Sequence, residues 1–489
     1  MDLKELRNEI DSIDSRLIEL FCERMEISRK IGDYKKKNNL PVLDRERERA
    51  KIEDIKSRCP EDCRAAAAEL YEKIFCLSRN AQTIHCGLLG EKLSHSYSPR
   101  IHMELGDYEY LLYEKSPREL EDFILNGCWD GLNVTIPYKK TLMAYCTELS
   151  QRAAEIGSVN TLIKRKDGSI YGDNTDAFGF ELLVKKLAID PKGKKALVLG
   201  SGGASRAVIR VLKELGAGEI KIISRTGEDN YENLSRNYDA EIIVNTTPLG
   251  TYPNNGSQAV DLSYFKNCKA VFDLVYNPAR TALIMQAESL CIPCAGGLYM
   301  LVGQAKRSAE LFSGKTIDDI KIQEIFNMLS GEMENIALIG MPGCGKSSVG
   351  AEISKITGRA FYDIDALIEE KIQMSIPEFF KSYGEAAFRK IETETLEEIS
   401  KLSGSVISCG GGIVTKEENY KLLHQNSKIV WLKRELSKLP IEGRPVSQSR
   451  KISDIYRERQ GLYRAFSDFS VENKLSIEAA AKEVLEALK

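Results

Sequence analysis

The chain has 489 residues, of which 43% are hydrophobic and 29% charged, and its net charge is −3. This length predicts about three domains of roughly 150 residues, each large enough to bury its own core. The balanced charge argues against nucleic acid or a membrane surface as a partner, and no apolar run approaches the roughly 18 residues that span a bilayer.

Neither the cysteines nor the N-terminus suggests secretion. The chain opens as MDLKELRNEIDSID, charged from its second residue, and its 12 cysteines lack the density of a disulfide scaffold. One Cys-x-x-Cys pair exists, Cys291 and Cys294, but no second pair and no nearby histidine could complete a zinc site. We therefore expect a cytoplasmic protein.

Three segments of the chain differ in charge density and in the pattern of apolar residues. Residues 1–82 are dense in charge and have the pattern of helices only. In residues 83–329, short β-rich runs alternate with helical stretches, which predicts βαβ units with parallel strands. Residues 334–489 open with a new strand, NIALIG, and alternate again. Linkers are expected at residues 80–83 and 330–335.

The first segment carries one long apolar stripe. Leucine and isoleucine recur at gaps of three and four from Leu3 to Leu20, and the pattern continues through Ile31 and Tyr34. This predicts a helix of some 35 residues, a rod of roughly 50 Å. Because the rest of the segment is too short to cover such a rod, we expect a second copy of the chain to pair with it.

Polar residues of this segment fall on shared faces. Arg24 and Lys35 are about three turns apart on one face, whereas Arg7 lies roughly 25 Å from Arg24 along the axis. Arg7 is therefore either a surface residue or a residue that enters a partner's pocket. A second helix is expected to present three residues on one face, Asp44, Arg47 and Glu48.

These positions, within LRNEIDSID, IGDYK and LPVLDRERE, resemble the all-helical chorismate mutase family over residues 1–82. The resemblance implies a pericyclic rearrangement of chorismate to prephenate, in which cationic clamps select the compact conformer and Lys35 and Gln82 stabilise the breaking ether oxygen. Periodicity alone would also fit a dimerising coiled coil with solvated charges. The implied chorismate-binding residues are Arg7 of a partner chain, Arg24, Lys35, Asp44, Arg47, Glu48, Ser78 and Gln82, with Arg24, Lys35 and Gln82 catalytic.

In the middle segment, LVLGSGGASRAVIRVL predicts a strand, a glycine turn and a helix whose N-terminus can hold a pyrophosphate. Ser205 replaces the third glycine of the usual fingerprint. The next strand ends in Ser-Arg-Thr, and an arginine there suits a 2′-phosphate, so NADP(H) is the expected cofactor. The predicted cofactor-binding residues are Gly200, Gly202, Gly203, Ala204, Ser224, Arg225 and Thr226.

Further motifs of the middle segment, SHSYSP, GLNVTIPYK, SVNT and GDNTD, crowd hydroxyls and amides at predicted strand ends, as a polyhydroxylated ligand requires. With FDLVYNP and GLYMLVGQ they resemble the shikimate dehydrogenase family over residues 83–329. The resemblance implies a Rossmann part (residues 181–290) and a substrate part (residues 83–180 and 291–329).

That resemblance also implies the chemistry. Hydride would pass between NADPH and the C3 carbonyl of 3-dehydroshikimate, while Lys139, positioned by Asp176, handles the hydroxyl proton. The sequence does not exclude quinate as a substrate or NAD as a cofactor. The implied shikimate-binding residues are Ser96, Ser98, Asn133, Thr135, Lys139, Asn160, Asp176, Tyr276 and Gln304.

The last segment contains a P-loop in its required context, a strand, Gly340-x-x-x-x-Gly345-Lys346-Ser347 and a helix. Backbone amides of such a loop hold the phosphates of ATP, Lys346 reaches the β and γ oxygens, and Ser347 binds Mg²⁺. The predicted ATP-binding residues here are Gly343, Cys344, Gly345, Lys346, Ser347 and Ser348.

The acceptor is suggested by FYDID, GEAAFRKIE, SCGGG and GRP, which resemble the shikimate kinase family over residues 334–489. Asp363 and Asp365 are expected on one face of a strand end. The resemblance implies that Asp365 contacts shikimate and acts as the base, that Asp363 supports Mg²⁺ through water, and that Arg444 reaches the ATP phosphoryl from a mobile lid. The implied shikimate-binding residues are Asp365, Arg389, Gly410, Gly411, Gly412 and Arg459.

Two features depart from that kinase pattern. The usual Arg-x-Pro-Leu-Tyr reads Arg459-Gln-Gly461-Leu-Tyr463, and the lid before Arg444 is short and lacks the usual second arginine.

Taken together, the three segments predict a multidomain fold: an all-α mutase domain, a two-domain α/β dehydrogenase with a Rossmann fold, and an α/β P-loop kinase. The alternative is that one terminal segment is a non-catalytic dimerisation or regulatory domain on a shikimate or quinate dehydrogenase.

Overall fold

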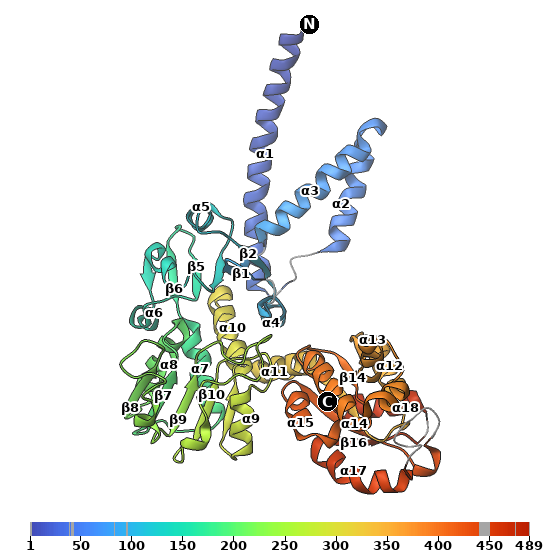
Figure 1. Cartoon of the computed structure of the whole chain (residues 1–489). Helices are drawn as coiled ribbons and strands as arrows, with labels where there is room; N and C mark the ends of the chain where they lie inside the picture. Colours follow the sequence, from blue (N-terminus) through green and yellow to red (C-terminus); the bar gives the residue numbers. More distant parts are fainter. Residues whose placement is uncertain are drawn as a thin grey trace. The chain divides into compact units, whose positions relative to one another are not determined.

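The computed structural model describes residues 2–38, 40, 44–82, 84–93, 96–439, 450–474 and 476–488 (Figure 1). The chain divides into two compact units. The first holds Met1–Thr175 and Ala305–Ile317, and the second holds Asp176–Gln304 and Asp318–Lys489.

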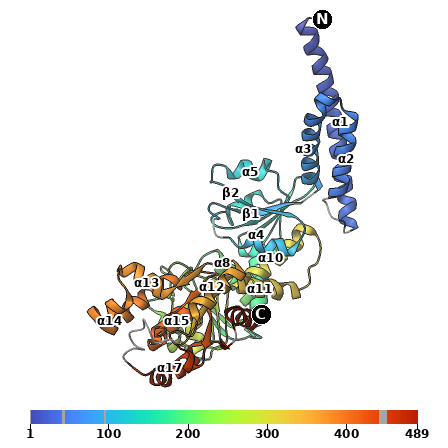
Figure 2. The ribbon, with the colours of Figure 1, turned by 90° about the vertical axis from the view of Figure 1, so that its right-hand side faces the viewer.

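Three helices open the first unit: α1 (Leu3–Lys37), α2 (Arg45–Arg58) and α3 (Arg64–Gln82). The 35 residues of α1 confirm the predicted rod. Helix α3 packs against both α1 and α2, and the N-terminal half of α1 extends past them (Figures 1 and 2). The apolar stripe of α1 is therefore uncovered in the single chain, with Ile10 57% and Leu17 55% exposed.

One detail of this segment was predicted wrongly. Asp44 lies just before α2 rather than within it, and its carboxylate accepts a hydrogen bond of 3.0 Å from the backbone N–H of Arg47. The first N–H groups of a helix lack partners inside the helix, and aspartate is favoured at the position that caps them. The spacing of Asp44 and Arg47 therefore reflects a cap and its first turn.

The rest of the first unit is built on a six-stranded sheet with the order β2-β1-β3-β5-β6-β4. Its strands are β1 (His85–Gly90), β2 (Glu109–Glu114), β3 (Gly131–Val134), β4 (Glu148–Leu149), β5 (Thr161–Lys164) and β6 (Ile170–Asp173). The helices are α4 (Ser98–Leu105), α5 (Leu120–Asn126) and α6 (Gln151–Ile156).

This sheet is mixed, so the prediction of parallel strands throughout the middle segment was wrong here. Strand β1 pairs in parallel with β2 and β3, but β5 runs antiparallel to both β3 and β6. A tight turn at residues 165–169 joins β5 to β6, and a parallel pair would need a crossover of a dozen residues or more.

The second unit begins with the sheet β11-β10-β9-β7-β8, in which every pairing is parallel, as predicted. The strands are β7 (Lys195–Leu199), β8 (Glu219–Ile223), β9 (Ile242–Asn245), β10 (Ala270–Asp273) and β11 (Cys294–Gly296). The helices are α7 (Thr175–Lys186), α8 (Gly203–Glu214), α9 (Ala282–Ser289), α10 (Leu298–Ser313) and α11 (Ile320–Met333). Strand order reverses at β7, and ligands of such sheets bind at this switch point.

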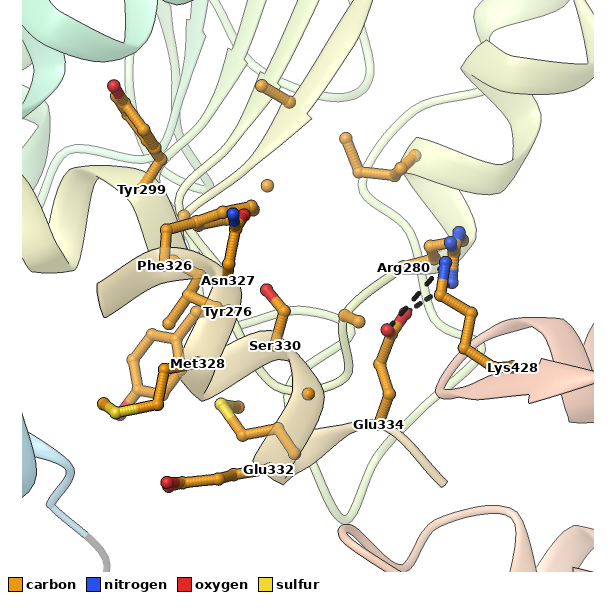
Figure 3. A pocket seen from close by; sticks show the side chains of 18 of the residues that line it. Tyr276, Arg280, Tyr299, Phe326, Asn327, Met328, Ser330, Glu332, Glu334 and Lys428 are labelled. Carbon is orange, nitrogen blue, oxygen red and sulfur yellow. Dashed lines mark hydrogen bonds and ion pairs between the residues drawn. The ribbon is translucent and has the colours of Figure 1, made fainter. Parts of the chain in front are cut away.

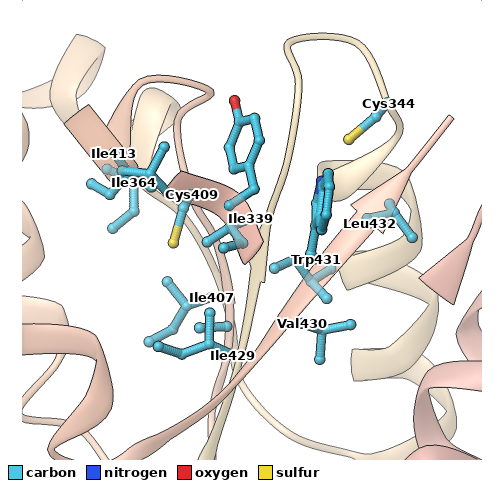
Figure 4. Close-up of a cluster of buried hydrophobic side chains, with 14 of the residues drawn as sticks. Ile339, Cys344, Ile364, Ile407, Cys409, Ile413, Ile429, Val430, Trp431 and Leu432 are labelled. Atoms are coloured by element: carbon cyan, nitrogen blue, oxygen red, sulfur yellow. The ribbon is translucent and has the colours of Figure 1, made fainter. Parts of the chain in front are cut away.

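A second parallel sheet, β13-β14-β12-β15-β16, completes this unit. The strands are β12 (Asn335–Ile339), β13 (Phe361–Asp363), β14 (Val406–Ser408), β15 (Ser427–Lys433) and β16 (Phe469–Glu472). The helices are α12 (Lys346–Thr357), α13 (Ile364–Ile372), α14 (Ile376–Ile399), α15 (Glu417–His424), α17 (Ile452–Phe466) and α18 (Ile477–Ala487). Ile339, Ile407, Ile429 and Leu432 form the centre of its core (Figure 4).

The expected linkers are largely helical. Helix α3 runs to Gln82, and α11 runs to Met333, so a single residue, Glu334, separates α11 from β12. The apolar spacing of Ile325, Leu329 and Met333 explains the second case, because all three side chains are buried and carry the helix through the predicted linker.

Candidate active sites

In the three-helix segment, α1 and α3 bring Arg24 and Ser78 together. The Arg24 guanidinium donates a hydrogen bond to the Ser78 hydroxyl and lies 5.7 Å from the centre of the Phe75 ring. Ser78 itself is buried and donates to the carbonyl of Ile74 at 2.8 Å. The arginine is therefore held in one orientation by a hydroxyl and a ring, and no motif in the sequence points to the contribution of Phe75.

The other predicted residues of this segment are spread along the helices. Lys35 is half-buried near the end of α1, and Glu48 is half-buried in the first turn of α2. Asp44 and Arg47 are exposed, as is Arg7 near the N-terminal end of α1. The side chain of Gln82 lies outside the described residues.

The substrate part of the middle segment contains a buried polar network around Asn133 on β3. The amide oxygen of Asn133 accepts from the Tyr110 hydroxyl at 2.8 Å, and its amide nitrogen donates to the Ser308 hydroxyl at 2.7 Å. Ser308 also contacts the hydroxyls of Thr161 (2.9 Å) and Thr175 (3.1 Å). Sequence reasoning found Asn133 but missed these four partners, because they come from distant strands and helices.

Asn160 belongs to the same network. Its amide nitrogen donates to the Thr175 hydroxyl at 3.0 Å, and its oxygen accepts from the backbone N–H of Thr175 at 2.7 Å. Asn133 and Asn160 are both at least 95% buried, so these bonds fix their amides firmly. Two of the predicted shikimate-binding amides are thus brought together in one network.

Three hydroxyls and a lysine complete the predicted set of this unit. Ser98 opens α4 and its N–H donates to the Ser96 hydroxyl at 3.2 Å. Thr135 and Lys139 are half-buried in the segment that follows β3.

The helices α7 and α10 carry Asp176 and Gln304, and glycine lets them approach closely. A Cβ atom at Gly179 would lie 2.5 Å from the carbonyl oxygen of Met300 and 3.2 Å from the Cβ of Gln304. Asp176 lies in the first turn of α7, and Tyr276 lies on the loop between β10 and α9. Asp176 and Lys139 belong to different units, so their pairing remains a prediction.

The glycine turn after β7 has the shape that a dinucleotide needs. Gly200 has φ +103°, which a non-glycine residue rarely adopts, and a Cβ at Gly202 or Gly203 would meet open space. The Ser205 hydroxyl donates to the carbonyl of Gly202 at 2.7 Å, so the serine that replaces the third glycine folds back onto the turn. Ala204 stands in the first turn of α8 beside these glycines.

Past β8, the predicted 2′-phosphate site is open to solvent. Arg225 and Thr226 are exposed and Ser224 is half-buried. The exposed Arg225 guanidinium is accessible to an anionic group such as a 2′-phosphate, and its role there stays a prediction.

In the last segment, a cavity of about 480 Å³ brings the predicted residues together. The Lys346 ammonium donates to the carbonyls of Gly340 and Met341, each at 3.1 Å. The predicted residues that line the cavity are Gly343, Gly345, Lys346, Ser347, Ser348, Asp365, Arg389, Gly411, Gly412 and Arg459. Cys344 is buried beneath the loop, and Arg444 lies outside the described residues.

Asp363 and Asp365 do not share a strand end, contrary to expectation. Asp363 ends β13 and caps α13, where its carboxylate accepts from the N–H of Asp365 at 3.1 Å, and Asp365 lies in the first helical turn. The pattern Asp-x-Asp fits both a strand and a capped helix, and the cap satisfies an otherwise unpaired N–H. Burial raises the pKa of Asp365, against the lowering effect of the nearby Lys346 ammonium.

The predicted acceptor-binding arginines are held by carboxylate and carbonyl groups. The Arg389 guanidinium contacts Glu392 at 2.7 Å and Glu385 at 2.9 Å, and Arg459 donates to the carbonyl of Gly411 at 3.0 Å. A Cβ at Gly412 would clash with the Arg389 guanidinium, so the glycine leaves the space that the arginine side chain occupies.

Several residues of this cavity were missed. A Cβ at Gly410 would lie 2.5 Å from the buried Glu392 carboxylate and 2.8 Å from that of Asp365, which places both acids beside the glycine run. Arg434 also lines the cavity and donates to the carbonyl of Gly343 at 3.4 Å. An arginine that follows β15 thus lies beside the P-loop, although the predicted lid lacked a second arginine.

Neither a membrane-spanning helix nor a metal-binding cluster occurs in the described part of the chain. Among its helices, none combines the length and apolar character that crossing a membrane requires. Within the same residues, no three His, Cys, Asp or Glu side chains gather as they would around a metal ion.

Three consecutive stretches of the chain match three known families. Residues 6–83 match chorismate mutase type II, residues 88–162 match the shikimate dehydrogenase substrate binding domain, and residues 342–489 match shikimate kinase.

Individual relatives agree with the middle match. A shikimate dehydrogenase (NADP(+)) of Clostridium perfringens (strain SM101) is 35% identical over 265 residues, which are 50% of this chain and 97% of that protein. One from Methanopyrus kandleri is 38% identical over 272 residues, 49% of this chain and 93% of that protein. A solved chorismate mutase/shikimate 5-dehydrogenase fusion protein from Clostridium acetobutylicum is 37% identical, covering 50% of this chain and 97% of that one, with a TM-score of 0.48. A chorismate mutase type II domain precedes the middle part of the chain, and a shikimate kinase domain follows it. Because the chain is 35% identical to a shikimate dehydrogenase and covers 97% of that protein's length, it belongs to the shikimate dehydrogenase family.

Proposed function

We propose that the chain catalyses three reactions of aromatic amino-acid biosynthesis: residues 1–82 convert chorismate to prephenate, residues 83–329 reduce 3-dehydroshikimate to shikimate, and residues 334–489 phosphorylate the 3-hydroxyl of shikimate. The observation that carries the proposal is that three families match three consecutive segments. The second product is the third substrate, so two of the reactions are consecutive. We infer that the protein works in the cytoplasm.

For the mutase, Arg24, Lys35 and Arg47 would hold the two carboxylates of chorismate, and Lys35 with Gln82 would stabilise the ether oxygen as its bond breaks. No covalent catalyst is needed, because the rearrangement is unimolecular. The Arg24 guanidinium, held between Ser78 and Phe75, is preorganised for this role. A homodimer through α1 would cover the exposed apolar stripe and bring Arg7 into the partner's site.

For the dehydrogenase, Asn133 and Asn160 would orient the hydroxyls of the substrate, and Ser96 and Ser98 its carboxylate. NADPH, held at the glycine turn and at Arg225, supplies the hydride when bound. The Lys139 ammonium, positioned by Asp176, would give a proton to the oxygen at C3 as the carbonyl becomes a hydroxyl. The buried amide network supports this assignment because its orientation is set before substrate arrives.

For the kinase, Arg389 and Arg459 would bind the carboxylate of shikimate, and Asp365 would accept the proton of its 3-hydroxyl. A raised pKa makes Asp365 a stronger base than an aspartate with the ordinary pKa would be. The P-loop and Lys346 would hold the phosphates of ATP, and Mg²⁺ at Ser347, with Asp363 acting through water, would neutralise their charge. Arg444 would close over the transferring group.

Three site variants in the full chain test these assignments. Arg24→Ala, Lys139→Ala and Asp365→Asn should each lower one activity by at least about 100-fold, in the order mutase, dehydrogenase, kinase, and leave the other two unchanged. Retention of mutase activity in Arg24→Ala would favour a non-catalytic dimerisation segment instead. Comparison of shikimate with quinate, and of NADP with NAD, would test the substrate and the reading of Arg225.

A further inference from the structure

The loop between β10 and α9 carries Tyr276 and is anchored at both ends within the Rossmann part. The buried carboxylate of Asp273 accepts from the N–H of Val275 at 3.0 Å and from the Thr281 hydroxyl at 2.6 Å. Thr281 in turn caps α9 by accepting from the N–H of Ile284 at 3.3 Å. Between these ends, the carbonyl of Asn277 accepts from the N–H of Tyr252 at 3.1 Å, whereas the backbone N–H groups of Ala279 and Arg280 have partners outside the Rossmann part.

Those partners come from the kinase part of the same unit. The N–H of Arg280 donates to the carbonyl of Gln425 at 2.8 Å, and the N–H of Ala279 donates to the side-chain oxygen of Asn426 at 3.2 Å. The side chain of Gln425 also accepts from Asn255 at 3.2 Å, on the loop beside this one. Residues 425–426 therefore satisfy the backbone N–H groups of two half-buried residues of the Tyr276 loop.

The Arg280 side chain adds charge to this contact. Its guanidinium lies 3.2 Å from the Glu334 carboxylate and 3.5 Å from Glu288, and it donates to the carbonyl of His424 at 3.2 Å. Glu334 begins the kinase part and also faces Lys428 (Figure 3). Because the side chains of Arg280 and Glu334 are only 18% and 12% exposed, solvent screens their attraction less than that of a surface pair.

The kinase side of the contact is rigid. Gln425 and Asn426 are both at least 95% buried. The side chain of Gln425 donates to Ser400 at 3.0 Å, and the side chain of Asn426 donates to the carbonyl of Leu402 at 3.0 Å. A surface fixed in this way can hold a loop that packs against it.

This surface lies at the end of the kinase sheet opposite the P-loop. Residues 425–426 precede β15, whereas the P-loop follows β12, and the two strands are parallel. The five residues of β12 span roughly 17 Å at about 3.3 Å each. A substitution at residues 425–426 is therefore separated from the phosphoryl-transfer site by the length of the sheet.

We propose that residues 424–426 of the kinase part, with Glu334, form a docking surface for the Tyr276 loop, and that this surface holds Tyr276 in place for the dehydrogenase reaction. The dehydrogenase would then depend on a surface that its fused kinase supplies. The inference rests on the proposed contact of Tyr276 with shikimate.

The test uses the full chain and approaches the contact from both sides. Asn426→Ala and Arg280→Ala should each raise hydrogen exchange at the Ala279 and Arg280 amides by at least about tenfold, and raise the dehydrogenase KM for shikimate by about fivefold or more. Kinase turnover should stay within about twofold of the unsubstituted chain, which also reports that the kinase part of Asn426→Ala is folded. Lys269→Ala, which removes an exposed ion pair with Glu241 in the same Rossmann part, is the matched control and should change neither quantity.

Unchanged exchange and unchanged KM in both variants would overturn the docking surface. Raised exchange with an unchanged KM would overturn its role in the dehydrogenase. Tyr276→Ala separates this from the proposed function: if that variant leaves the KM for shikimate unchanged, the assignment of Tyr276 fails first, and the inference fails with it.

Discussion

Asn133 shows how a single side chain can be prepared for a ligand by its neighbours. An asparagine amide can face either way, but here its oxygen accepts from Tyr110 and its nitrogen donates to Ser308. The amide nitrogen also donates to the Thr161 hydroxyl at 3.3 Å, so both of its N–H groups have partners in the network. The tyrosine and the two hydroxyls therefore decide which way the Asn133 amide faces.

Removing one hydroxyl tests this role. Tyr110→Phe should raise the dehydrogenase KM for shikimate by about three- to tenfold, because loss of one buried hydrogen bond costs about 1 kcal/mol and frees the amide. Tyr108→Phe is the matched control, since its hydroxyl contacts His102 at 2.6 Å in the same aromatic cluster. Equal effects of the two variants on KM would show that general packing, rather than the orientation of Asn133, is responsible.

His102 makes the first unit sensitive to acid. Its ring stacks on Tyr110 with 3.9 Å between centroids, and burial lowers its pKa to about 3. The unfolded chain takes up a proton near the ordinary pKa of 6.5, but the folded chain does not. Stability contributed by neutral His102 is therefore full above pH 6.5 and is lost as the pH falls toward 3, by about 1.4 kcal/mol per unit.

The measurement is urea unfolding between pH 4 and pH 8. The sequence has two tryptophans, so a Trp431→Phe background leaves Trp129, buried in the substrate part, as the reporter of the first unit. His102→Phe keeps a stacked ring and should flatten the dependence of the unfolding free energy on pH below about 6.5. An unaltered slope would contradict the assigned role of His102.

At the scale of elements, the glycine run after β14 shows how a loop sets the position of a side chain. Gly412→Ala would place a methyl group against the Arg389 guanidinium, so the kinase KM for shikimate should rise by about tenfold or more while the KM for ATP changes little. Gly461→Ala is the control: it lies inside α17, its Cβ would meet open space, and it should stabilise the kinase part by about 0.5–1 kcal/mol. Equal KM values for shikimate in Gly412→Ala and the unsubstituted chain would refute the argument.

Elements defined by local patterns were predictable from the sequence. The stripe from Leu3 to Tyr34 predicted α1, and the P-loop between β12 and α12 follows from spacing alone. Patterns with two local solutions were not: Asp44 was expected within a helix but caps α2, and Asp365 was expected on a strand face but lies in the first turn of α13. Asp363 does end β13, but it also caps that helix. Periodicity does not distinguish a cap from an element's own residue, because the difference rests on one or two backbone hydrogen bonds.

The site residues likewise divide into those that local motifs predict and those that only tertiary contacts define. Asn133, Asp365 and Arg389 stand in recognisable motifs, but their supporting partners Ser308 and Glu392 carry no local signal. Ser308 reaches Asn133 across 175 residues of sequence, and only the folded sheet brings them together. Residues that orient others are thus defined by tertiary contacts, which a single sequence does not contain.

At the scale of the whole molecule, α1 raises the question of what a second chain contributes. Its apolar stripe is more than half exposed at Leu3, Ile13 and Leu20, which would cost stability unless it is covered. Arg7 lies on the same uncovered stretch, and some 17 residues separate it from Arg24 in one chain, roughly 25 Å along the helix. The proposed homodimer would explain both facts if each mutase site took Arg24 from one chain and Arg7 from the other.

Mixing two inactive variants decides between one chain and two. Arg7→Ala and Arg24→Ala should each lose mutase activity when assayed alone. The first variant lacks the arginine that enters the partner's site, and the second lacks the arginine of its own site. In a mixed dimer, one site combines the intact Arg24 of the first chain with the intact Arg7 of the second, while the other site lacks both. Since random exchange makes about half of the dimers mixed, refolding an equal mixture should restore about a quarter of the unsubstituted activity, given the closed two-fold pairing expected of such helices.

Restoration requires exchange, so mutase activity should stay absent when the two variants are mixed without unfolding and their dimers remain intact. If the refolded mixture stays inactive although labelled chains have exchanged, Arg7 acts within its own chain or not at all, and α1 pairs for stability alone.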